Sequence, residues 1–91
     1  MVEHLIASTV ALGMPREQAT RLAAQTCLGA GKMLVESADS PAQLRKNVTS
    51  PNGTTHAALV TFNDLGFEEV VGKSVKAAVD RSIELGKPPS E

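Results

Sequence analysis

The most chemically distinctive residues of the chain lie in one hydroxyl-rich loop, residues 47–56, between two segments with helical patterning. The loop brings Ser50, Gly53, Thr54 and Thr55 to the place where a new helix should begin. The first N–H groups of a helix have no partner within it, and the helix dipole adds partial positive charge at that end. A carboxylate or phosphate binds well there, and the hydroxyls of Ser50 and Thr55 can orient or protonate a polar atom beside it.

The same residues also allow a plainer interpretation. Ser50 and Thr54 are residue types that commonly cap a helix, so the loop can be a simple connector. In the ligand-binding interpretation, Pro51 and Gly53 instead fix an unusual turn, and the N–H groups of residues 53–55 converge on one point. The residues of the loop leave both interpretations open.

The surroundings of the loop narrow its chemistry. The chain has neither the lysine of a Walker phosphate loop nor a GxGxxG motif after a strand, so it lacks a nucleotide-binding motif of its own. A mostly neutral loop suits a carboxylate better than a triphosphate. His56 has acid–base chemistry, but one residue into the helix we expect it to face a neighbour or solvent; His4 stands alone in the first helical segment. No spacing indicates a Ser-His-Asp triad or a metal site.

Five segments have the apolar periodicity of helices, and none has the alternation of a strand. They cover residues 2–12, about 15–37, about 41–47, from the loop to about 66, and 67–86. Gly13 should end the first, Pro15 should open the second in its first turn, and Ser40 should cap the third. We therefore expect residues 1–86 to form one all-α domain, followed by a flexible tail at 87–91.

Two of these helical segments indicate close packing against a neighbour. Gly29 and Gly31 lie inside the second, where each costs roughly 0.5–1 kcal/mol relative to alanine, so another backbone should approach there. The alternative is that the alanines of this segment merely favour a helix. The last segment has a doubled, mostly apolar stripe, wide enough to meet two neighbours: Val70, Val71, Ser74, Val75, Ala78, Val79, Ser82 and Ile83. A short chain with only two aromatic residues buries little surface alone, which favours a partner subunit.

Composition and charge exclude several classes of function. The formal net charge is −1, and the nine basic and ten acidic residues are spread along the chain, so there is no basic patch for nucleic acid. No apolar run approaches the ~20 residues of a membrane helix, and no secretory signal is visible. Cys27 is the single cysteine, which excludes an intrachain disulfide and fits a reducing cytoplasm. On an apolar helix face, it should be a buried thiol.

Several motifs resemble the C-terminal domain of pyrroline-5-carboxylate reductase. The likeness covers nearly all the chain and includes the signature loop of that family. The matching stretches are Leu12-Gly13-Met14-Pro15-Arg16, residues 21–26 and 28–33, Gln43-Leu44-Arg45, residues 48–55, Gly66-Phe67, Arg81-Ser82 and Glu84-Leu85. Three positions depart from the family pattern: Asn52 replaces a usual glycine, Lys46 a usually acidic residue, and His56 a usually apolar one.

The resemblance implies the last step of proline biosynthesis, the NAD(P)H-dependent reduction of 1-pyrroline-5-carboxylate. It implies a fold of the 6-phosphogluconate dehydrogenase C-terminal-like type, in which the helices of two subunits interlock as a homodimer. NAD(P)H would be held by a Rossmann domain that these 91 residues do not contain, so we expect the chain alone to bind no cofactor.

The resemblance also implies a role for each residue of the loop. The substrate carboxylate, as in the product proline, would bind Ser50, Gly53 and Thr54. Thr55 would contact the ring nitrogen as the catalytic residue, and Val48 would lie near the nicotinamide. The alternative is a non-catalytic helical dimerisation module that keeps the loop only as a helix cap. A strand followed by GxGxxG in the upstream coding sequence would favour the enzyme.

Overall fold

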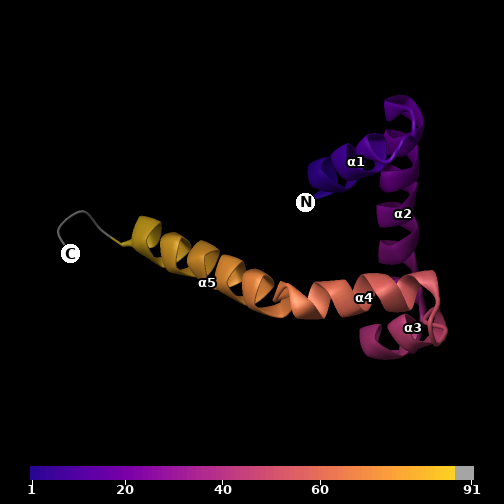
Figure 1. Cartoon of the computed structure of the whole chain (residues 1–91). Helices are drawn as coiled ribbons and strands as arrows, with labels where there is room; N and C mark the ends of the chain where they lie inside the picture. Colours follow the sequence, from indigo (N-terminus) through magenta and orange to yellow (C-terminus); the bar gives the residue numbers. More distant parts are fainter. Residues whose placement is uncertain (88–91) are drawn as a thin grey trace. The chain divides into compact units, whose positions relative to one another are not determined.

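The computed structural model describes residues 1–87, and all regular structure within them is helical, as predicted. The helices are α1 (Val2–Ala11), α2 (Arg16–Glu36), α3 (Pro41–Asn47), α4 (Thr54–Asp64) and α5 (Phe67–Gly86) (Figure 1). The chain forms two compact units that divide between Arg45 and Lys46. That residues 1–86 act as one domain stays a prediction, and the tail predicted at 87–91 lies, from residue 88 onward, outside the described residues.

The first unit contains a helical hairpin, in which α1 folds back along the beginning of α2 (Figure 1). Gly13 makes the turn with a φ of +114°, a conformation that side-chain-bearing residues rarely adopt. Its N–H donates a hydrogen bond to the Val10 carbonyl at 3.0 Å. Pro15 lies one position earlier than expected, as the N-cap of α2, and its carbonyl accepts the hydrogen bond of the Ala19 N–H at 2.9 Å.

Two alanines of α2 form the buried core of this hairpin: Ala19 is 2% exposed and Ala23 5% exposed. Their small side chains let α1 approach closely, and Leu5 and Thr9 of α1 line the same hollow. The predicted close approach at the helical glycines 29 and 31 is not found within the described chain, since a Cβ at either position would meet nothing within 4 Å. With its ten residues α1 spans only about 15 Å, so it covers only part of α2.

The prediction of a buried thiol is wrong for this chain, because Cys27 is exposed. Cys27 lies one turn beyond Ala23 on the same face of α2, and Ala23 is the last buried residue on that face. Periodicity placed Cys27 on the same helix face as the buried Ala23. It carried no information on how far α1 extends along it.

The third helix begins where the sequence predicted. The Ser40 hydroxyl accepts a hydrogen bond from the Gln43 N–H at 3.1 Å, which makes Ser40 the N-cap of α3. Pro41 follows as the first helical residue, where its missing N–H costs nothing. Helix α3 leads directly into the loop of the candidate site.

The second unit contains a corner between α4 and α5. Gly66 lies between the helices with a φ of +78°, and its N–H donates to the Asn63 carbonyl at 3.2 Å. Phe62 of α4 and Phe67 of α5 pack across the corner, with ring centroids 4.7 Å apart and ring planes inclined by 35°. Glycine makes the sharp change of direction, and the ring pair holds it.

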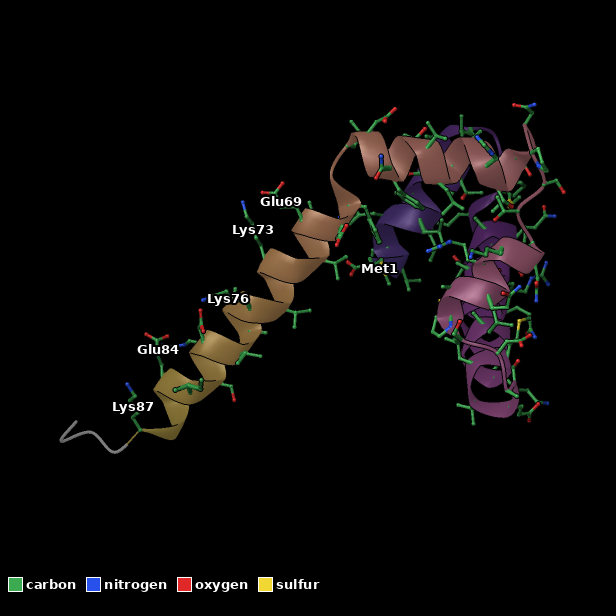
Figure 2. All side chains as sticks on the ribbon, turned by 90° about the horizontal axis from the view of Figure 1, so that it is seen from below. Met1, Glu69, Lys73, Lys76, Glu84 and Lys87 are labelled. Carbon is green, nitrogen blue, oxygen red and sulfur yellow. The ribbon has the colours of Figure 1, made fainter. Side chains whose placement is uncertain are left out.

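Helix α5 has a charged edge that includes two ion pairs at i,i+4 spacing. Lys73 and Glu69 approach to 2.7 Å, and Lys76 and Asp80 to 2.6 Å. Figure 2 shows Glu69, Lys73 and Lys76, with Glu84 and Lys87, along one edge of α5. Because the side chains are largely exposed, each pair contributes only a few tenths of a kcal/mol.

The opposite face of α5 is apolar and uncovered within the described chain. We call it the α5 stripe; it consists of Val70, Val71, Val75, Val79 and Ile83, whose exposed fractions lie between 44% and 59%. The periodicity of the stripe agrees with the prediction from sequence. A contiguous exposed apolar face of this kind is typical of a surface that binds another protein.

Candidate functional site

A tight turn immediately before α4 shapes the candidate site. The Ser50 carbonyl accepts a hydrogen bond from the Gly53 N–H at 2.9 Å, with Pro51 and Asn52 between them. Asn52 has a φ of +62°. Proline at the second position and a left-handed residue at the third are the features of a type II β-turn.

The left-handed residue of this turn is not a glycine. Pro51 and Gly53 both belong to the unusual turn, as predicted, but Gly53 has a φ of −85° and a ψ of −177°, which is ordinary extended backbone. Asn52 takes the left-handed conformation instead, and asparagine tolerates it better than most residues do. The turn is therefore formed although asparagine stands where the resembling family usually has glycine.

Helix α4 begins without a side-chain cap. Gly53 is its N-cap, and the Gly53 carbonyl accepts the first helical hydrogen bond, from the Ala57 N–H at 3.1 Å. The hydroxyls of Ser50 and Thr54 make no capping hydrogen bond. The interpretation of the loop as a connector capped by these two side chains is therefore wrong.

The donors at this helix start differ from expectation by one residue. The Gly53 N–H is occupied by the Ser50 carbonyl, so it does not join the others. The first turn consists of Thr54, Thr55 and His56, whose N–H groups have no carbonyl to bond within the helix. These three N–H groups are the backbone donors that the site offers.

The predicted site residues all lie on this short stretch, with different degrees of burial. Gly53 and Thr55 are half-buried, whereas Ser50, Thr54 and Val48 are exposed. Within residues 1–87, the hydroxyls of Ser50, Thr54 and Thr55 make no hydrogen bond to the protein. Hydroxyl groups that the fold does not use are available to a ligand.

A hollow of about 360 Å³ lies next to the loop, on one face of α4. It is lined by Thr49, His56, Leu59, Val60 and Asn63. The lining thus includes the exposed His56 and, two turns along the helix, the polar residue Asn63. We did not predict the hollow from sequence, although the spacing of residues 56, 60 and 63 is that of one helix face.

Other kinds of site are not indicated in the described part of the chain. No group of three or more His, Cys, Asp or Glu side chains among residues 1–87 is arranged to hold a metal ion. None of the helices that the structure describes combines the length and the apolar character needed to cross a membrane. His4 is exposed on α1.

Replacing Gly53 by alanine should destabilise the turn. A Cβ at this position would lie 3.1 Å from the Ser50 carbonyl oxygen and 3.4 Å from the Ser50 Cβ, and both belong to the turn itself. We expect a loss of about 1 kcal/mol in the free energy of unfolding, measured by urea denaturation. Thr54→Ala is the matched control and should change it little, because the Thr54 hydroxyl makes no hydrogen bond. Equal midpoints for both variants would contradict the tight packing at Gly53.

Comparison with known proteins shows which protein family the chain matches. The model of the family described as "Pyrroline-5-carboxylate reductase dimerisation" matches residues 1–85. The chain is 51% identical over 76 residues to the pyrroline-5-carboxylate reductase of Pseudomonas aeruginosa, an alignment covering 84% of this chain and 28% of that protein. It is 42% identical over 87 residues to the pyrroline-5-carboxylate reductase of a Synechocystis species, covering 96% and 33% respectively.

Solved structures agree with the sequence relatives. The Plasmodium falciparum pyrroline carboxylate reductase with NADP bound matches with a TM-score of 0.89 at 32% identity, covering 94% of this chain and 35% of that one. The Coxiella burnetii pyrroline-5-carboxylate reductase matches with a TM-score of 0.89 at 40% identity, covering 96% and 32%. The chain therefore spans about a third or less of the length of these relatives.

Proposed function

Because the chain belongs to the pyrroline-5-carboxylate reductase dimerisation family, we propose that it serves an enzyme that reduces 1-pyrroline-5-carboxylate to proline with NAD(P)H. In this proposal the chain supplies the subunit interface and the loop that binds the substrate carboxylate. The single cysteine fits a cytoplasmic enzyme.

One observation supports the binding half of the proposal. Ser50 and Thr55 lie in the turn and first helical turn that carry the open N–H groups of α4, and within residues 1–87 the protein uses neither their hydroxyls nor these N–H groups for its own hydrogen bonds. In a simple connector, we would expect these hydroxyls to accept capping hydrogen bonds from the helix. Donors left open at a helix N-terminus suit an anionic group instead.

Each group then has a defined role. The substrate carboxylate accepts hydrogen bonds from the N–H groups of Thr54 and Thr55 and from the Ser50 hydroxyl. Gly53 acts through its lack of a side chain, which allows the turn to close under this carboxylate. The Thr55 hydroxyl donates to the ring nitrogen, which gains electron density as the C=N bond is reduced, and so stabilises the developing charge.

The cofactor is assigned to a domain outside this chain. Dinucleotide binding of the Rossmann type needs a strand followed by a glycine-rich turn, and residues 1–87 have only helices as regular structure. NAD(P)H supplies the hydride when bound to such a domain. The residue of this chain proposed to border the nicotinamide is Val48, which is 60% exposed and thus accessible.

The α5 stripe supports the proposal that the partner is a second copy of the chain. Five large aliphatic side chains are half exposed on one helix face, and a second subunit would remove them from water, so they favour association. A non-catalytic dimerisation module would use the same stripe. The unused hydroxyls of Ser50 and Thr55 favour the enzyme over that alternative.

Nuclear magnetic resonance of the isotope-labelled chain tests carboxylate binding. L-proline should shift the amide resonances of Thr54 and Thr55, because their N–H groups donate to the carboxylate in this proposal. Pyrrolidine, which has the same ring without a carboxylate, should leave them in place. Equal shifts with both compounds, or shifts with neither, would remove the support for a carboxylate site here.

A further inference from the structure

The turn before α4 holds a reactive dipeptide, Asn52-Gly53, and the proposed function gives no role to the side chain of Asn52. Asn52 is exposed and is followed by Gly53, the one residue type that has no side chain to shield its own backbone nitrogen. A backbone nitrogen that reaches the side-chain amide carbon of the preceding asparagine can displace its ammonia. The two other asparagines of the chain are followed by Val48 and Asp64, whose side chains hinder this approach.

We propose that Asn52 is a site of spontaneous deamidation, and that the hydrogen bond from Gly53 to Ser50 controls its rate. The Gly53 nitrogen loses its proton and attacks the Cγ of Asn52. The new C–N bond closes a five-membered succinimide ring. The side-chain nitrogen of Asn52 leaves as ammonia and takes up the proton that the Gly53 nitrogen lost. Water then adds to either carbonyl of the ring and breaks one of the two C–N bonds, giving aspartate or isoaspartate. Water is the only co-reactant.

The turn bears directly on the first step. The Gly53 N–H donates to the Ser50 carbonyl at 2.9 Å, so the proton that must leave is held in a hydrogen bond. The nitrogen becomes a free nucleophile only when this bond opens. The closed turn therefore slows the reaction, and any condition that opens the turn accelerates it.

The product changes the charge at the candidate site. A carboxylate appears at position 52, two residues before the first helical residue, Thr54, at the positive end of the α4 dipole. Isoaspartate also adds one atom to the backbone of a turn that closes at 2.9 Å. This consequence rests on the proposed function: a carboxylate of the protein beside the site should weaken binding of a substrate carboxylate, by on the order of tenfold.

Mass spectrometry of the whole chain, incubated at mildly alkaline pH, tests the modification. Trypsin should release residues 47–73 as one peptide, which contains all three asparagines, so Asn47 and Asn63 serve as internal controls. We expect Asn52 to convert at least tenfold faster than either, to both products, and faster still in urea. Equal rates at the three asparagines would overturn the proposal. Equal rates for Asn52 with and without urea would overturn the role of the turn.

Two variants separate the modification from its consequence. The Asn52→Gly chain should show no conversion at this position while Asn47 and Asn63 behave as before. In the complete reductase, Asn52→Asp should raise KM for the imine by on the order of tenfold. Conversion of Asn52 together with an unchanged KM for Asn52→Asp would uphold the modification and count against the carboxylate site.

Discussion

Replacing Thr55 by alanine in the complete reductase should lower kcat/KM by about 10- to 100-fold, the worth of one hydrogen bond to a group that becomes charged in the transition state. The side chain of Thr55 is half-buried at the start of α4, and within the described chain its hydroxyl has no other partner. The free energy of unfolding should therefore stay within about 0.5 kcal/mol of its original value. Steady-state kinetics and urea denaturation measure the two quantities.

Two further variants make this result specific. Thr55→Ser keeps the hydroxyl and should retain most of the activity. Thr61→Ala removes a hydroxyl of the same helix that already donates to the Ala57 carbonyl at 3.0 Å, and it should leave kcat/KM unchanged. Full turnover by Thr55→Ala would favour the non-catalytic module instead.

Replacing Val75 by aspartate should dissociate the proposed homodimer. Val75 lies in the middle of the α5 stripe and is 58% exposed in the single chain. Covering this position with a second copy would bury an unpaired carboxylate, which costs several kcal/mol. We expect the dissociation constant to rise at least a hundredfold, as measured by analytical ultracentrifugation over a dilution series.

The charged edge of α5 provides the matched control. Lys76 follows Val75 directly but pairs with Asp80 in solvent, so Lys76→Ala should leave the dissociation constant nearly unchanged. Dissociation by both variants would indicate a general loss of helix α5. A dimer that survives Val75→Asp would show that the stripe is not its interface.

Local chemistry was enough to predict most of the helices and their ends. Gly13 and Ser40 act as the sequence indicated, one by a left-handed turn and the other by a hydroxyl that accepts an N–H. Such signals depend on a few neighbouring atoms, so the sequence contains them in full. Pro15 was misplaced by one residue because proline suits both the N-cap and the first helical position.

The detailed conformation of the loop could not be predicted from the sequence. Asn52 and Gly53 both tolerate a positive φ, and only the backbone angles show that Asn52 adopts it. The hydrogen bond from the Gly53 N–H to the Ser50 carbonyl decides which N–H groups remain for a ligand. The exposure of Cys27 depends on how far α1 extends along α2, a property of packing that periodicity does not contain.

The ring pair at the corner between α4 and α5 gives the chain an optical signal. Phe62 and Phe67 are its only aromatic residues, as it has no tyrosine or tryptophan. Aromatic circular dichroism in the near ultraviolet therefore arises from these two rings, whose centroids are 4.7 Å apart. Because one ring belongs to each helix, this signal reports whether α4 and α5 stay packed across the corner, and its loss on dilution would show that the ring packing is lost when subunits separate.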